Sequence, residues 1–140
     1  MIKFKGLDFP RDIKIFITTP FTAHKWRKKV NEIGFNKIIR NIKKPNDLKI
    51  ADDRFIEVLT NNHKVMYAYL RRITKDPNPC MITSLTLLEI CKQKKIAASL
   101  VIGADKEDNS IVGHSWIEIN GSAINELNQN LKKYTRMIEI

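Results

Sequence analysis

The chain has 140 residues, of which 43% are hydrophobic and 29% charged, a composition that fits one globular domain and excludes an intrinsically disordered chain. It has no apolar run near the roughly 18 residues of a membrane span, and its charged N-terminus lacks the apolar stretch of a signal peptide, so we expect a cytoplasmic protein. The net charge of +10 lies entirely before Cys80, because residues 1–79 carry 18 Lys and Arg against 8 Asp and Glu, whereas residues 80–140 carry seven of each.

The first half of the sequence is predicted to be mainly helical. Weak alternation in "IKIFI" favours a short strand that Pro20 bounds. Apolar residues then recur at helical spacing, which predicts a basic amphipathic helix over about residues 23–42, capped by Thr22 and ended by Pro45. A second amphipathic helix is predicted over about residues 51–72, before the loop "TKDPNP".

The hydrophobic period changes after a third helix, which is predicted over about residues 79–94. "IAASLVIG" and "IVGHSWIEI" are predicted to be strands joined by the turn "KEDNS". Asn120-Gly121 then predicts a hairpin turn of the primed type, leading into the returning strand "SAINE". A final strand is expected over about residues 134–140. Helices followed by a small antiparallel sheet indicate an α+β fold.

A thiol stands at the first turn of the third helix. Asn78 is a good N-cap residue and Pro79 suits the first helical position, which places Cys80 at the second. The free N–H groups and the positive end of the helix dipole there favour a thiolate, which is the nucleophilic form, and could also hold an oxyanion. The alternative interpretation is a small apolar residue at the start of a buried helix.

The second cysteine is predicted to have a structural role. Cys91 lies near the C-terminal end of the same helix, where we expect it in the core. On one helix the two cysteines would be about 16 Å apart, too far for a disulfide. Two isolated cysteines and three scattered histidines give no metal-ligand spacing, so we expect neither a metal nor another cofactor.

A nucleophilic thiol needs a base, and the histidines are the candidates. His24, in a basic stretch, and His63, within the second helix, are both predicted to lie on the surface. His114 lies in a strand, where alternation places it on one face with Trp116, while Ile117 points to the other face. His114 is therefore either a base that meets the helix start or a core histidine.

The group that would orient the base is Asn125 or Glu126. With a two-residue turn at Asn120-Gly121, Asn125 shares the face of His114 and Glu126 points away. A three-residue turn or one bulge reverses this. The sequence leaves both open, although only the carboxylate of Glu126 would also stabilise an imidazolium.

These segments resemble a known family. "CMITSLTLLEICKQKKIAASLVIG" followed by "GHSWIEINGSAINE" is similar to the lasso-peptide leader peptidases, the transglutaminase-like B proteins of lasso-peptide biosynthesis, over about residues 75–140. The resemblance implies a transglutaminase-like, papain-like cysteine protease fold. It also implies one domain over residues 1–140, with a helical part at 1–79 and a catalytic core at 80–140.

The resemblance assigns a role to each candidate site residue. Cys80 matches the nucleophile of the family, His114 the base, and Glu126 the orienting acid, which is usually Asp in the family. Gly103 matches a glycine that ends a strand, whereas Lys95 stands where the family usually has a helix-ending glycine.

The resemblance also implies a function and partners. The family removes the leader from a ribosomally made lasso precursor, preferring threonine second from the end of the leader. In many members a separate leader-binding protein presents the leader, and an ATP-dependent lasso cyclase then closes the ring. Because 140 residues leave no room for a leader-binding domain, we expect the stand-alone protease half, without cofactors.

Two other functions stay open. A transglutaminase-like amidase or acyltransferase would share the thioester step and differ only in the acceptor. A non-catalytic module would instead bind peptide or nucleic acid through the basic N-terminal helices, whose charge is either a solvated surface or a patch for an acidic partner. Nucleic acid is the less expected ligand, because the sequence has no helix-turn-helix, zinc-finger or RNP-like signature.

Overall fold

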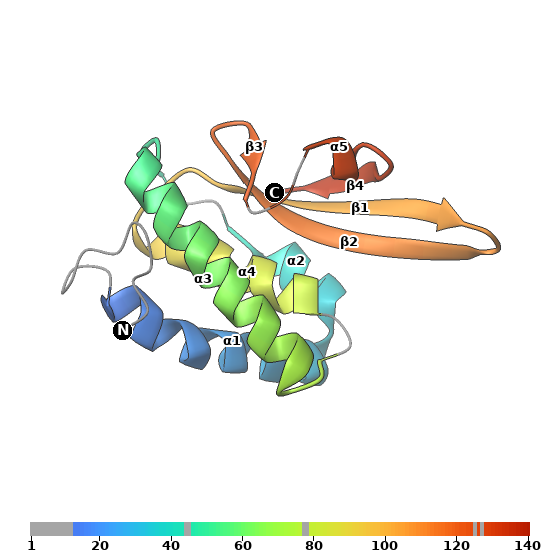
Figure 1. Cartoon of the computed structure of the whole chain (residues 1–140), viewed down its shortest axis with the longest axis horizontal. Helices are drawn as coiled ribbons and strands as arrows, with labels where there is room; N and C mark the ends of the chain where they lie inside the picture. The colour runs from blue at the N-terminus through green and yellow to red at the C-terminus, as the bar shows by residue number, and fades with distance from the viewer. Residues whose placement is uncertain (1–12, 44–45, 77–78, 125, 127) are drawn as a thin grey trace.

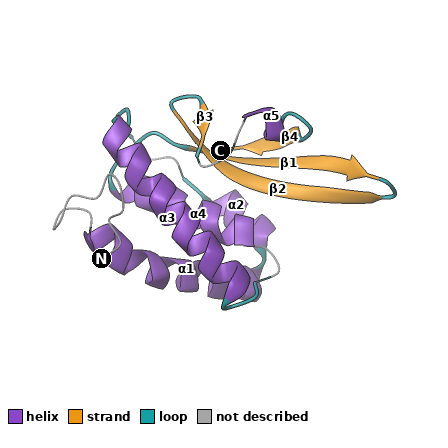
Figure 2. Ribbon diagram, in the orientation of Figure 1, coloured by secondary structure: helices purple, strands orange, loops and turns teal. Residues whose placement is uncertain are grey.

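The computed structural model describes residues 13–43, 46–76, 79–124, 126 and 128–140. Figure 1 and Figure 2 show two layers, a group of helices and a small sheet packed on it, which is the α+β fold that the order of elements predicts. The helices are α1 (Ile13–Ile33), α2 (Phe35–Asn41), α3 (Asp53–Arg72), α4 (Pro79–Gln93) and α5 (Asn128–Leu131), and the strands are β1 (Ser99–Glu107), β2 (Ser110–Ile119), β3 (Ser122–Ala123) and β4 (Thr135–Glu139).

The predicted strand over "IKIFI" is wrong, because this segment forms the first turns of α1. Ile15, Thr19 and Ala23 are buried at a spacing of four residues, so the helical period decides the structure rather than the weak alternation. Pro20, the predicted end of the strand, lies inside the helix. Thr22 also lies inside it, donating its hydroxyl to the Thr18 carbonyl, and therefore is not an N-cap.

The predicted helix over residues 23–42 is two helices. Gly34 separates α1 from α2 with φ 82° and ψ 153°, a conformation that a residue with a side chain adopts only with strain. The break lets α2 turn back and bury Ile38. Pro45, the predicted end of this segment, lies outside the described residues.

The next two helices lie within two residues of their predicted bounds. Asp52 caps α3 by accepting a hydrogen bond of 2.8 Å from the Phe55 N–H. α4 begins at Pro79 as predicted, and its predicted cap Asn78 lies outside the described residues. At the other end of α4, Lys95 has φ 55°, so it adopts the left-handed conformation that glycine takes most readily.

The sheet is antiparallel throughout, in the order β3-β2-β1-β4. The Asn-Gly hairpin is confirmed, since both turn residues have positive φ, 53° at Asn120 and 80° at Gly121, and Ile119 pairs with Ser122. The returning strand is shorter than predicted, because pairing stops at Ala123. In Figure 1 the far end of the β1–β2 hairpin extends beyond the helices.

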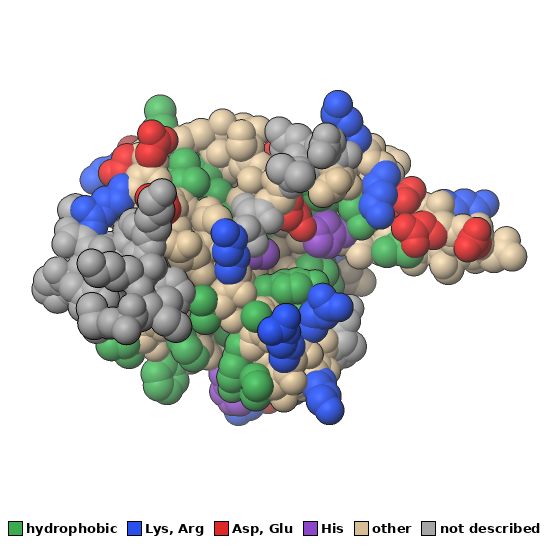
Figure 3. All heavy atoms as spheres, viewed as in Figure 1, with side chains coloured by type: hydrophobic (Ala, Val, Ile, Leu, Met, Phe, Trp, Pro, Cys, Tyr) green, Lys and Arg blue, Asp and Glu red, His purple; other side chains and the backbone are tan. Residues whose placement is uncertain are grey.

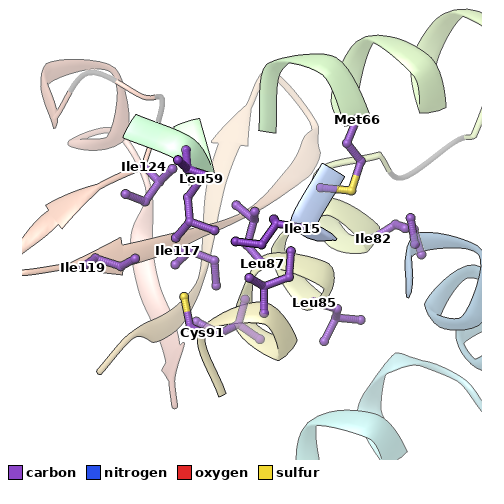
Figure 4. Packing of buried hydrophobic residues seen from close by; sticks show 14 of the residues in the cluster. Ile15, Leu59, Met66, Ile82, Leu85, Leu87, Cys91, Ile117, Ile119 and Ile124 are labelled. Carbon is purple, nitrogen blue, oxygen red and sulfur yellow. The ribbon is translucent and has the colours of Figure 1, made fainter. Parts of the chain in front are cut away.

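The core lies between α4 and its neighbours. α4 lies between the other elements: it contacts the helices α1 and α3 and also the strands β1 and β2. Figure 4 shows buried aliphatic side chains from both layers converging there, among them Leu59, Leu87 and Ile117. Cys91 belongs to this cluster and is 1% exposed, which confirms its predicted structural position. α4 is thereby held rigidly against the sheet, and with it the start of the helix.

No helix among the described residues combines the length and the apolar character that crossing a membrane requires.

Candidate active site

The start of α4 meets an open edge of the sheet. β3 pairs only with Glu118 and Ile119, so within the described residues the earlier part of β2 has no strand on that side. Hydrogen bonding in an antiparallel strand alternates between neighbours, which turns the Ser115 N–H toward this open edge. That N–H donates to the sulfur of Cys80. The helix start therefore takes the place that a further strand would occupy.

This arrangement brings Cys80 and His114 together. The imidazole of His114 forms a hydrogen bond with the Cys80 side chain. On the other side of the ring, Nε2 lies 2.5 Å from Oε1 of Glu126. Because Nε2 is engaged by the carboxylate, Nδ1 is the ring nitrogen left to face the thiol. In Figure 3, histidine and acidic side chains lie together near the middle of this face of the molecule.

Glu126 reaches His114 without a three-residue turn. The turn has two residues, which would direct Glu126 away from His114 if the strand continued. Instead, pairing ends at Ala123, the Ile124 N–H bonds the Ile117 carbonyl at 2.9 Å, and the chain leaves the strand geometry. Glu126 is therefore free to return to the imidazole. Its rival, Asn125, lies outside the described residues.

The electrostatics favour a thiolate and an imidazolium. Burial alone would raise the pKa of Cys80, but hydrogen bonds from His114 and from the Ser115 backbone outweigh burial and hold this pKa below its ordinary value. Burial would lower the pKa of His114, whereas the hydrogen bonds to Cys80 and Glu126 raise it to about 9. By contrast, burial raises the pKa of Cys91 to about 12, so that thiol stays protonated.

The side chain of Ser115 contributes to the same site. Its hydroxyl oxygen is buried and lacks a well-aligned hydrogen-bond partner among the described residues, yet it lies close enough to the Cys80 sulfur to lower the pKa of the thiol.

We predict that Ser115→Ala shifts the alkylation of Cys80 to higher pH. The substitution removes the hydroxyl and keeps the backbone N–H, so the thiolate loses one of its stabilising donors while the hydrogen bond from the strand remains. The rate of iodoacetamide labelling measured against pH gives the apparent pKa of the thiol. Ser110→Ala is the matched control, since that exposed hydroxyl donates to the Glu107 carbonyl at the hairpin tip. Superimposable profiles for the two variants would contradict the prediction.

Two aromatic side chains enclose the imidazole. The ring centroids of Trp116 and Tyr134 lie 5.7 Å and 5.3 Å from that of His114, and 6.0 Å from each other. Trp116 shares the face of His114, as alternation predicts, and is 3% exposed. Its indole N–H donates to Glu118, which Arg136 holds with two further hydrogen bonds. The aromatic wall is therefore fixed in place, and it limits the access of water to His114.

Gly103 makes room for this wall. It pairs with His114 across β1 and β2. A Cβ atom at this position would lie 2.7 Å from Cβ of Tyr134 and 3.1 Å from the Trp116 ring.

We predict that Gly103→Ala lowers the free energy of unfolding by about 1–3 kcal/mol, a typical cost of overpacking. The Cβ atom of Tyr134 is fixed to the backbone and cannot rotate away, so strand β4 or the indole of Trp116 must shift. Urea unfolding of the purified protein measures the effect. Gly113→Ala is the control, because its nearest neighbour would lie 4.0 Å away. Equal stabilities of the two variants would show that the packing is looser than described.

The prediction for His63 is wrong, since this residue is not on the open surface. It is partly buried in α3, its ring stacks on Tyr67 with centroids 5.9 Å apart, and it feels the charges of Glu126 and His114. Burial lowers its pKa, which favours the neutral imidazole. Helical spacing could have identified it, because Leu59 and Met66, four residues before and three after it, are buried. His24 is exposed, as predicted.

No group of three or more His, Cys, Asp or Glu side chains in the described part of the chain could hold a metal ion. The two cysteines are free. The site brings together a thiol, an imidazole and a carboxylate, in the order Cys80, His114 and Glu126.

Comparison with known proteins gives a family match. The family model described as the transglutaminase-like superfamily matches residues 57–139, a range that contains most of α3, all of α4 and the sheet. Neither a curated protein nor a solved structure matches the chain.

Proposed function

Because this chain belongs to the transglutaminase-like superfamily, which includes cysteine peptidases, we propose that it is a cysteine peptidase that removes the leader from a lasso-peptide precursor. The observation that carries the proposal is the line of contacts from Cys80 through His114 to Glu126, with the pKa of the thiol lowered and that of the imidazole raised to about 9. The leader-peptidase specificity is supported by the sequence resemblance over about residues 75–140.

In this proposal Cys80 is the nucleophile. Its thiolate attacks the carbonyl carbon of the scissile peptide bond, forming a C–S bond and an oxyanion. The backbone N–H of Cys80, at the second position of α4, is one of the free donors of the first helical turn and stabilises that oxyanion. The donor belongs to the backbone of a helix that packs against the sheet, so the fold sets its direction.

His114 moves the proton in both halves of the reaction. As an imidazolium it protonates the amine of the core peptide, the C–N bond breaks, and the leader remains as a thioester on Cys80. The neutral imidazole then removes a proton from water, hydroxide attacks the thioester, and the leader leaves with a free carboxylate. Glu126 orients the ring and stabilises its charged form in each step.

We further propose that the chain acts with two other proteins. A separate leader-binding protein would present the precursor, and an ATP-dependent lasso cyclase would use the released core amine.

Mass spectrometry tests the proposal directly. The chain is mixed with a lasso precursor peptide, a leader-binding protein and a small primary amine, and the masses of the products are measured. A leader with a free carboxylate and a core with a free amine support the peptidase. A leader that carries the primary amine as an amide in place of its free carboxylate identifies an acyltransferase instead. Intact precursor, recovered while Cys80 still reacts rapidly with iodoacetamide, contradicts the proposed substrate.

A further inference from the structure

A groove separate from the Cys80 site lies along the C-terminal half of α4. Its volume is about 750 Å³, within the range of pockets that enclose ligands. The floor is apolar and includes Leu85, Leu88 and Ile96. α1, the segment after α2 and the end of the sheet at Ile140 form its walls. No residue of the Cys80 site lines it.

The rim of this groove is basic. Among the described residues, the lysines that line it are Lys25, Lys29, Lys43 and Lys92. The ammonium groups of Lys25 and Lys29 lie over the ring of Trp26, 5.3 Å and 5.2 Å from its centroid, which holds them at the opening. Part of the excess positive charge of the N-terminal half is thereby gathered around an apolar floor.

The acidic residues of the groove neutralise only part of this rim, because one of them pairs with a rim lysine and the other with an arginine outside the groove. Glu89 accepts from the Lys25 ammonium and from the Trp26 indole at 2.6 Å, and Glu139 pairs with Arg136 at 3.1 Å. Among the described residues, Lys29, Lys43 and Lys92 have no ion pair. A ligand that complements the groove therefore carries carboxylates together with apolar side chains.

We propose that the groove binds an acidic segment, containing apolar residues, of the same peptide whose carbonyl reaches Cys80. This inference rests on the proposed peptidase function and names a second contact for its substrate. We infer a substrate segment and not a partner protein, because a stable protein interface buries about 800 Å² on each side, whereas this groove is a local hollow of about 750 Å³. Binding of an acidic segment would also give a role to the positive charge of the N-terminal half.

The distance along α4 sets the spacing between the two contacts. Lys92 follows Cys80 by 12 residues on one helix, which is about 18 Å at 1.5 Å per residue. An extended peptide covers about 3.3 Å per residue. Because α4 is covered by its neighbours, this axial distance is the shortest path, and the acidic segment is expected at least five or six residues from the bond at Cys80.

An affinity label tests this spacing without requiring turnover. The probe is a synthetic peptide with five residues alternating glutamate and leucine, a six-residue glycine-serine spacer, and a lysine whose side chain carries a chloroacetyl group. We expect it to alkylate Cys80 roughly tenfold faster at low salt than a peptide whose acidic block is replaced by glycine and serine. This rate advantage of the acidic probe should fall at high salt, where charges are screened. It should also fall with a one-residue spacer, which is too short to span the two contacts.

Charge reversal identifies the groove. The double variant Lys29→Glu, Lys92→Glu is expected to lose the rate advantage of the acidic probe. The matched control Lys14→Glu, Lys106→Glu changes the net charge equally, at exposed positions outside the groove, and is expected to keep it. Equal labelling of the two variants, or no advantage of the acidic probe with the natural chain, overturns the proposal.

Two further readouts separate this inference from the proposed function. Iodoacetamide, which has no acidic block, should label the groove variant and the natural chain at the same rate, showing an intact Cys80 site. A chain that shows the groove effect but never hydrolyses precursor would contradict the peptidase and leave the docking result standing. A groove variant that keeps the rate advantage but no longer binds the leader-binding protein assigns the groove to that partner and overturns the proposal.

Discussion

Cys80→Ala is expected to abolish cleavage of the precursor, with a rate loss of roughly 10⁴-fold or more. The variant keeps the helix start, the imidazole and the carboxylate but has no sulfur to form the thioester. Cys80 is only partly buried and lies outside the core cluster, so the variant should fold with a melting temperature within a few degrees of the natural chain. Precursor cleavage followed by mass spectrometry, with circular dichroism as a measure of folding, checks both halves.

The second cysteine provides the control for this result. Cys91→Ala removes a thiol that is 1% exposed and whose pKa is raised to about 12 by burial, so it should lower stability and leave turnover intact. In the natural chain, iodoacetamide should modify Cys80 and spare Cys91. Processing by Cys80→Ala at the natural rate would remove the basis of the proposed mechanism.

Glu126→Gln is expected to reduce cleavage by about 10²–10⁴-fold and to move the alkaline limit of activity to lower pH. The charge of Glu126 and its hydrogen bond to Nε2 help to raise the pKa of His114 to about 9. The reactive pair of thiolate and imidazolium forms as the pH rises through the lowered pKa of Cys80, and it is lost as the pH rises through that of His114. Without the carboxylate the pKa of His114 falls, so the active range narrows from its alkaline side.

The variant Glu126→Asp separates the effect of the carboxylate charge from that of the side-chain length. It introduces the acid that the resembling family usually has, keeps the charge and shortens the side chain by one methylene group. Activity should lie between that of the natural chain and that of Glu126→Gln, with the alkaline limit less displaced. The pH dependence of kcat/KM measures both variants. If Glu126→Gln kept the natural rate and pH profile, Glu126 would have no role in orienting His114.

A site residue could be placed from the sequence where its position depends on residues close to it in the chain. Pro79 and the apolar run behind it place Cys80 at a helix start. Alternation along β2 puts His114 and Trp116 on one face. Asn120 and Gly121 form the turn that their types favour, with positive φ at both positions. Each of these features depends on neighbours within a few residues, which is why the sequence was sufficient.

Other features depended on contacts between distant segments. Glu126 can approach His114 only because β3 ends after two residues. The type of turn at Asn120-Gly121 does not determine where β3 ends. His63 lies close enough to Glu126 and His114 to interact with their charges, and it is carried there by α3, which packs on α4. The segment "IKIFI" is helical because burying Ile15, Thr19 and Ala23 outweighs a weak local preference for a strand.

By itself, therefore, the sequence determined the α+β order of the elements, the thiol at the start of a helix and the imidazole on its strand face. Only the tertiary structure decided which acid meets the imidazole, that a second histidine lies beside them, and that the lysines of the N-terminal half line one groove. Short-range backbone preferences govern the first set. The second arises from the packing of α4 against a sheet edge left open by a very short strand, and no local pattern in the chain encodes that packing.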